Sequence, residues 1–352
     1  MKVGVIGFAR SGKTTVFNAI TGAQASVGAF GSRDANVAVL KVPDERVERL
    51  AAIYSPKKVT HAEFQFVDIA PNECVGDDKA LDAAALNLLK NVDALVHVVR
   101  AFADEDVAHP SGSVDTVRDC AALEEELALG DLLIIEKRLE RLTKENRKDR
   151  EYELLVQCQK HVESGASLRT LALSEHDERE LAGFCFLSQK PLLLLGNYGE
   201  ESIGSPDPAG LENYAGERDQ TLVALCGSME MEVSQLAEEE RQAFRDGLGL
   251  GESSRARFIR AAYEMMGLIS FLTVIGSEVR AWTVRRGTKA GEAAGVVHSD
   301  MQRGFIRAEV VGYDDFIAAG SMTKAKEQGL VRLEGKEHPV QDGDIILFRF
   351  NV

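Results

Sequence analysis

Eight residues near the start of the chain constrain its fold more than any other segment. Residues 7–14 read Gly-Phe-Ala-Arg-Ser-Gly-Lys-Thr, which is the pattern G-x-x-x-x-G-K-T. The apolar run of residues 2–6 predicts a buried strand before the pattern, and residues 15–20 predict a helix after it. A glycine loop between a strand and a helix binds phosphate, because backbone N–H groups and the helix dipole face the anion. The alternative, a glycine-rich turn with a chance lysine, explains neither flank.

This loop supplies the candidate residues for phosphate and metal binding. We expect Lys13 to neutralise the β- and γ-phosphates of a nucleotide, and the Thr14 hydroxyl to hold Mg²⁺. Arg10 either adds positive charge near the phosphates or points to solvent. The chain is therefore expected to bind a nucleoside triphosphate or diphosphate. The full set of phosphate-binding candidates is Arg10, Ser11, Gly12, Lys13, Thr14 and Thr15.

The composition is that of an intracellular globular protein. The 352 residues are 45% hydrophobic, enough for two or three domains, and no apolar run is long enough to cross a membrane. Because the chain begins directly with a strand, no signal peptide is expected. The five scattered cysteines form no C-x-x-C pair and suggest neither disulfides nor a zinc site. We therefore expect a cytoplasmic location and no metal besides Mg²⁺.

The charge is distributed unevenly. Residues 271–352 contain 11 basic and 11 acidic residues, so the net charge of −15 lies in residues 1–270. A strip within the C-terminal part is basic and either contacts a phosphate-rich partner such as RNA or forms a solvated face. No DNA partner is predicted. The strip contains Arg280, Arg285, Arg286, Lys289, Arg303 and Arg307, against Glu292 and Asp300.

Strand and helix patterns alternate after the loop and predict a doubly wound α/β domain. Several strand candidates are continuous apolar runs, as expected for a parallel sheet covered by helices on both faces. Ligands bind at the carboxyl ends of such strands, so Gly7, Asp68 and Asn197 are expected at one edge. The strand candidates are residues 35–42, 63–69, 94–99, 191–196 and 221–226.

Two further regions depart from this alternation. Residues 115–187 have helical apolar spacing and a densely charged middle, which predicts an inserted antiparallel helical hairpin. Residues 271–352 predict a small α+β module with strands at 271–275, 279–283, 305–311 and 345–350 and a helix at 313–319. The expected domains are therefore 1–114 with 188–270, 115–187, and 271–352.

Four groups of segments resemble the YchF/Obg-like ATPase family. The phosphate loop continues as Lys13-Thr14-Thr15-Val16-Phe17-Asn18-Ala19, similar to the family's G-K-S-T-x-F-N-A. Residues 36–37 with 42–46 resemble its N-V and V-P-D-x-R segments, and residues 197–200 match its N-x-x-E motif. The tail is the most similar part, at residues 279–283, 287–290, 293–295, 304–309, 313–316, 340–344 and 348–352.

The resemblance implies a GTPase-type domain, an inserted helical domain and a C-terminal TGS domain of β-grasp type. It also implies ribosome or RNA association and a nucleotide preference that includes ATP. Ordinary GTPases read guanine with N-K-x-D, whose aspartate accepts two hydrogen bonds. This chain has Tyr198 in place of the lysine and Glu200 in place of the aspartate. A plain strand-end turn is the alternative for these residues. The base-binding candidates are Asn197, Tyr198, Glu200, Cys226, Gly227 and Ser228.

The chain departs from the family after the strand that ends at Asp68, which is expected to order the Mg²⁺ shell through water. Pro71 replaces a glycine whose N–H bonds the γ-phosphate, and proline has no N–H to donate. Ser32 aligns with the family's metal-binding threonine and keeps the hydroxyl. Asn72 stands at the place of the water-orienting glutamine of ordinary GTPases; no catalytic residue is otherwise assigned.

The expected function is that of a ribosome-associated YchF-type ATPase or GTPase that binds ATP, or GTP, with Mg²⁺ and hydrolyses it slowly. The alternative is a nucleotide-gated adaptor that has largely lost hydrolysis because of Pro71. A P-loop kinase would leave the tail motifs unexplained. Trp282 is either a core residue or a platform for an RNA base. The oligomeric state is not predicted.

Overall fold

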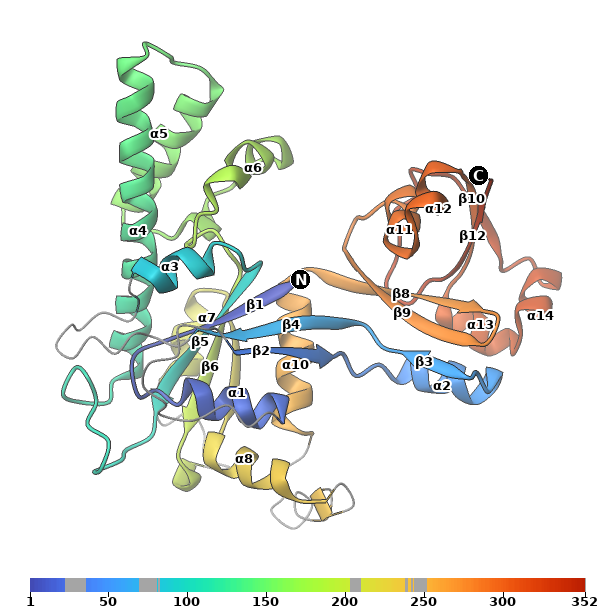
Figure 1. Cartoon of the computed structure of the whole chain (residues 1–352), viewed down its shortest axis with the longest axis horizontal. Coiled ribbons are helices and arrows are strands. Elements are labelled where there is room, and N and C mark those ends of the chain that lie inside the picture. The colour runs from blue at the N-terminus through green and yellow to red at the C-terminus, as the bar shows by residue number, and fades with distance from the viewer. Residues whose placement is uncertain are drawn as a thin grey trace. The chain divides into compact units, whose positions relative to one another are not determined.

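The computed structural model describes residues 1–22, 36–69, 81, 83–202, 210–237, 240–241, 243 and 252–351 (Figure 1). These residues form two compact units, Met1–Val39 with Gln65–Arg257 and Leu40–Phe64 with Phe258–Val352. The division differs from the predicted one at residues 40–64, which group with the C-terminal residues, whereas 115–187 group with the first unit. The three-domain division remains a prediction.

The first unit is built on a six-stranded sheet in the order β2-β4-β1-β5-β6-β7. β1 pairs in parallel with β4 and β5, and β6 pairs in parallel with β5 and β7. This order and direction confirm the doubly wound α/β fold. The strands are β1 (Lys2–Ile6), β2 (Asn36–Lys41), β4 (Glu63–Asp68), β5 (Ala94–Ala101), β6 (Leu192–Tyr198) and β7 (Thr221–Leu225).

Helices cover both faces of this sheet, which is why its central strands are apolar throughout. α1 (Lys13–Thr21) and α8 (Gly227–Gln235) pack together on one face. On the other face, α3 (Ala83–Leu89), α7 (Leu211–Glu217) and the start of α4 (Thr116–Lys144) share one apolar cluster with strand residues such as Leu95 and Leu194. Between β6 and α7 lies the short helix η3 (Glu200–Ser202).

The predicted helical hairpin is present between β5 and β6. α4 and α5 (Arg150–Glu163) pack side by side, with Asp115 and Asp149 accepting backbone N–H bonds at their N-termini (Figure 1). The apolar stripe of α4 serves two cores: Leu123 and Leu127 pack in the sheet cluster, while Ile135 packs with α5. The chain returns through η1 (Leu168–Thr170), α6 (Glu175–Leu181) and η2 (Ala182–Phe184).

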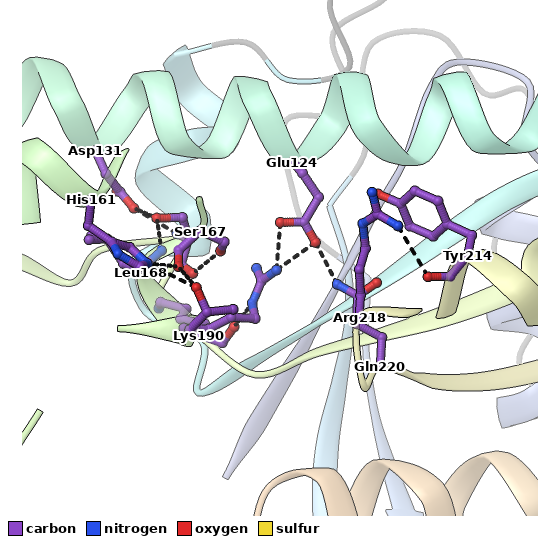
Figure 2. A network of polar contacts seen from close by, with 12 residues as sticks. Glu124, Asp131, His161, Ser167, Leu168, Lys190, Tyr214, Arg218 and Gln220 are labelled. Atoms are coloured by element: carbon purple, nitrogen blue, oxygen red, sulfur yellow. Dashed lines mark hydrogen bonds and ion pairs between the residues drawn. The ribbon is translucent and has the colours of Figure 1, made fainter. Parts of the chain in front are cut away.

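A buried polar network fixes α4 to the returning chain (Figure 2). The Asp131 carboxylate accepts hydrogen bonds from Leu187 N at 2.9 Å and from Ser188 N and Oγ, both at 2.7 Å. Burial raises the pKa of Asp131, while these three donors oppose the shift. Nearby, Gln220 donates to Glu124 at 2.7 Å. α4 is therefore anchored both to the segment before β6 and to the turn before β7.

The second unit contains a six-stranded mixed sheet in the order β11-β10-β12-β8-β9-β3. β8 pairs antiparallel with β9 and parallel with β12, which pairs antiparallel with β10. All four predicted strands are present and agree with the expected β-grasp type. The strands are β3 (Lys58–Thr60), β8 (Leu268–Ile275), β9 (Glu278–Arg285), β10 (Phe305–Val311), β11 (Arg332–Glu334) and β12 (Ile345–Phe350).

Small side chains let helix α11 (Ala290–Val297) of this unit lie close to the sheet. Ala290, Ala293 and Ala294 are buried against a cluster that includes Phe271 and Phe348. The helix predicted at 313–319 is α13, with the same bounds. The helices are α2 (Glu45–Tyr54), α10 (Ser254–Met265), α11 (Ala290–Val297), α12 (Ser299–Arg303), α13 (Tyr313–Ala319) and α14 (Met322–Glu327).

Trp282 packs against the apolar cluster of this sheet rather than standing free. Its ring stacks on Phe271, its Nε1 donates to Thr273 Oγ1 at 2.9 Å, and the Arg280 guanidinium lies 3.8 Å from the ring centroid. These contacts support the interpretation of Trp282 as a core residue over that of an RNA-base platform.

Candidate nucleotide-binding site

The phosphate loop connects β1 directly to α1, and its two glycines have backbone angles that favour glycine. Gly7 has φ 143° and Gly12 has φ 88°, and Gly12 forms the N-cap of α1. A Cβ at Gly7 would lie 2.5 Å from the Val98 carbonyl oxygen, and one at Gly12 would collide with the Asn197 amide. Both glycines therefore permit close backbone approaches that a side chain would prevent.

Lys13 lies at the first turn of α1 with its ammonium folded over the loop. Its Nζ donates to the carbonyl oxygens of Gly7 at 2.8 Å and Phe8 at 2.7 Å, and the side chain is buried. Burial and the Lys13 charge lower the pKa of His97 on β5 to about 3, so this imidazole is neutral. A lysine ammonium beside the backbone N–H groups at the N-terminus of a helix is an arrangement that can bind a phosphate.

The end of β4 supplies the acidic side of the site. Thr14 Oγ1 donates to Asp68 Oδ2 at 3.1 Å, and Asn36 Nδ2 approaches the same oxygen at 3.5 Å. Asp68 is 1% exposed, and its Oδ1 is buried with no hydrogen-bond partner within the described part of the chain. Asp68 Oδ1 and the Thr14 hydroxyl are oxygen atoms of the kind that Mg²⁺ and its bound waters require as ligands.

Asn197, near the end of β6, forms hydrogen bonds with the phosphate loop and with the start of α8. Its Nδ2 donates to Ser11 O at 3.0 Å, and its Oδ1 accepts from Gly227 N at 3.0 Å. The side chain is 4% exposed. Both ends of the amide therefore hold backbone, one in the phosphate loop and one at the start of α8.

Other base-binding candidates gather around this amide. Ser228 Oγ lies 3.4 Å from Glu200 Oε1 and 3.2 Å from Cys226 Sγ. Glu200 is exposed, whereas Tyr198 is half-buried and packs against the sheet cluster. The structure thus brings together residues from the β6 and β7 strand ends, 28 positions apart in the sequence for Ser228 and Glu200.

The remaining candidates are distributed as follows. Arg10 is exposed, has φ 62°, and donates from Nη1 to the Ala108 carbonyl at 3.2 Å. Ser11 Oγ is buried and has no partner among the described residues, and Thr15 is half-buried on α1. Ser32, Pro71 and Asn72 lie outside the described residues.

Several buried polar residues beside the loop were not predicted from the sequence. His97 and Arg100 interrupt the apolar run of β5, which is a visible signal, and Arg100 donates to Val107 O at 2.8 Å. His109 pairs with Asp119 at 2.9 Å, with both side chains buried. These contacts shape the loop that follows β5 and that Arg10 touches.

A glycine loop between β1 and α1, an aspartate ending β4 and an asparagine ending β6 define a P-loop NTPase of the GTPase type. Comparisons with known proteins agree. A family model described as "50S ribosome-binding GTPase" matches residues 2–137, and the model YchF-GTPase_C, described as "Protein of unknown function (DUF933)", matches residues 268–351.

Full-length relatives identify the family. The "Ribosome-binding ATPase YchF" of Bacillus subtilis is 40% identical, with 100% of both chains covered. The Haemophilus ducreyi protein of the same name is 38% identical over 100% of this chain and 99% of its own. The solved structure of the Schizosaccharomyces pombe YchF GTPase has a TM-score of 0.87 at 28% identity, covering 99% and 97%. The chain belongs to the YchF family, which confirms the resemblance seen in its motifs.

Proposed function

We propose that this protein binds ATP together with Mg²⁺, with GTP as a second nucleotide, and hydrolyses it slowly in association with the ribosome. The observation that carries the proposal is the Thr14–Asp68 contact beside the Lys13 ammonium. The curated relatives are named ribosome-binding ATPases, which supports both the reaction and the partner.

The phosphates would lie over the N-terminus of α1. Lys13 would exchange the Gly7 and Phe8 carbonyls for phosphate oxygens, since a charge-assisted hydrogen bond is stronger than a bond to a neutral carbonyl. Thr14 and Ser32 would be direct metal ligands, and Asp68 would hold a metal-bound water. Bound Mg²⁺ would neutralise charge that develops on the phosphates during hydrolysis.

The base would be bound at the ends of β6 and β7. Asn197 holds the phosphate loop and the start of α8 in register. The base would then be lined by Tyr198, Glu200, Cys226, Gly227 and Ser228. Glu200 replaces the shorter aspartate that binds guanine in N-K-x-D proteins. We therefore propose weakened guanine specificity and acceptance of ATP.

The adaptor alternative, in which hydrolysis is largely lost because of Pro71, is not favoured by the comparisons, because the curated relatives carry ATPase names. Pro71 and Asn72 lie outside the described residues. Slow turnover remains part of the proposal because proline cannot donate a hydrogen bond to the γ-phosphate.

The ribosome or its RNA is the proposed partner, and a cytoplasmic location follows from it. Within the basic strip, Lys289 pairs with Glu337, Arg303 with Asp300, and Arg280 covers Trp282. Arg285, Arg286 and Arg307 are exposed. In the described part of the chain, no helix is long and apolar enough to span a bilayer.

The experiment that tests the proposal measures ATP and GTP binding and single-turnover hydrolysis on the unaltered chain, Lys13→Ala and Pro71→Gly. We expect ATP binding and slow hydrolysis in the unaltered chain, loss of both in Lys13→Ala, and faster hydrolysis in Pro71→Gly. Failure of the unaltered chain to bind either nucleotide with Mg²⁺ present would overturn the proposal.

A further inference from the structure

The segment between Asn36 and Asp68 leaves the nucleotide-binding unit and returns to it. β2 begins at Asn36 and passes into the second unit at Leu40, and β4 comes back from that unit at Gln65 and ends at Asp68. One end of each strand thus lies at the nucleotide-binding site, at Asn36 or at Asp68, and the other end belongs to the C-terminal unit. Residues 40–64 contain α2 and β3.

Backbone pairing joins this segment to the C-terminal sheet. β3 runs parallel to β9, with Lys58 opposite Glu278 and Thr60 opposite Arg280 (Figure 1). Lys58 N donates to Ser277 O at 3.1 Å, and Thr60 Oγ1 donates to Glu278 Oε1 at 2.9 Å. A strand of three residues has little stability by itself, so the conformation of β3 depends on β9.

An arginine joins the same segment to the turn before β12. The Arg46 guanidinium donates to both Asp44 oxygens, at 2.9 and 2.8 Å, and from Nη1 to Asp342 Oδ2 at 2.8 Å. Asp342 Oδ1 in turn accepts the Ser270 N–H at 2.8 Å. One carboxylate therefore links α2, β8 and the turn at residues 341–344, in the planar geometry that arginine pairs favour.

Apolar contacts complete the attachment. The Tyr54 ring at the end of α2 stacks on Phe316 of α13, with centroids 5.8 Å apart. Phe316 is fully buried, as are Val47 and Leu50 on the inner face of α2. Backbone, ionic and apolar contacts together hold α2 and β3 on the C-terminal unit. An exposed ion pair alone would contribute little to this attachment.

We propose that residues 40–64 transmit the nucleotide state of the Asn36–Asp68 site to the C-terminal unit, with the Arg46–Asp342 pair as one of the contacts that carry the signal. This inference rests on the proposed nucleotide binding. The two units are joined here by continuous strands with no linker, since Val39 is followed directly by Leu40 and Phe64 by Gln65. Asn36 and Asp68 are therefore connected to α2 and β3 through the backbone of β2 and β4.

Hydrogen–deuterium exchange of the full chain with Mg²⁺ and ATP, ADP or no nucleotide tests this coupling. We expect exchange in peptides covering residues 278–285 and 341–350 to differ between the ATP and nucleotide-free states by about fivefold or more, the lower range of allosteric effects. A separate titration measures nucleotide affinity. If no nucleotide binds, the proposed function itself fails. If ATP binds and these peptides do not change, the inference alone is overturned.

Matched variants identify the contact. Asp342→Asn keeps the acceptor for Ser270 N–H but removes the charge that faces Arg46, and Arg46→Ala removes the whole pair. Glu337→Gln is the control, because it breaks the ion pair with Lys289 in the same unit without touching residues 40–64. Both test variants are expected to bind ATP and to lose at least half of the nucleotide-dependent difference in exchange. If both variants keep the whole nucleotide-dependent difference in exchange, the proposal is contradicted.

Discussion

The side-chain amide of Asn197 donates a 3.0 Å hydrogen bond to the backbone carbonyl of Ser11, so the end of β6 holds the phosphate loop in place. The same amide accepts the Gly227 N–H. The residue expected at the base-binding motif thus acts on the phosphate side of the site as well. Loss of this side chain should affect the two halves of the nucleotide site together.

We predict that Asn197→Ala weakens nucleotide binding and lowers the free energy of unfolding by about 1–3 kcal/mol, because it leaves buried backbone groups unpaired. Thermal unfolding and nucleotide titration measure the two effects. Asn91→Ala, at an exposed asparagine of the same unit, is the control. Equal behaviour of the two variants would contradict this assignment.

Asp68→Asn should make nucleotide affinity insensitive to Mg²⁺. The substitution keeps an oxygen for Thr14 but removes the buried negative charge that would order the metal's water shell. We expect ATP affinity in Mg²⁺ to fall about tenfold, as for the loss of one charge-assisted contact. Titrations with Mg²⁺ and with chelator check this, beside Glu63→Gln on the same strand. An equal loss in chelator would argue against a role in metal binding.

Asp131→Ala should destabilise the first unit. The carboxylate accepts three hydrogen bonds from Leu187 and Ser188, and its removal leaves these donors buried. We expect a loss of about 1–3 kcal/mol or more in unfolding free energy, measured by urea titration. Glu136→Ala, exposed on the same helix, should change stability little. A comparable loss of unfolding free energy in both variants would contradict the stabilising role assigned to Asp131.

His97 should make the folded chain sensitive to acid. Burial and the Lys13 charge lower its pKa to about 3 in the folded state, whereas an unfolded histidine titrates near 6.5. Between these values the unfolded state binds the extra proton, so stability falls as pH falls, by at most about 1.4 kcal/mol per pH unit. His97→Phe should therefore flatten unfolding free energy between pH 6 and pH 4, and the exposed His176→Phe should not.

The sheet of the first unit was largely predictable because its signals are local. Continuous apolar runs such as residues 192–195 mark strands, and the carboxyl ends of the strands bring Asp68 and Asn197 to the phosphate loop and the start of α1. The predicted C-terminal strands rest on equally local patterns. In each case a few neighbouring residues determine the element.

The grouping of residues 40–64 with the C-terminal residues was not predictable from the sequence, because the partners of this segment are remote. α2 has an ordinary amphipathic pattern, and nothing in it specifies that Tyr54 meets Phe316. β3 has only three residues and pairs with a strand more than 200 positions away. Likewise, the contacts of Asn197 depend on three segments, so the motif predicted its place at the site but not its hydrogen bonds.

α4 contributes to two hydrophobic clusters along a single uninterrupted helix of 29 residues. Leu123 and Leu127 complete the core under the sheet, and Ile135, Leu139 and Leu142 complete the core of the hairpin. We therefore do not expect the hairpin to be removable as a unit. Deleting residues 115–187 would also remove Leu123 and Leu127 from the core beside β5. The two cores should melt as one cooperative transition, and a shortened protein that keeps its sheet must retain the helix at least through Leu127.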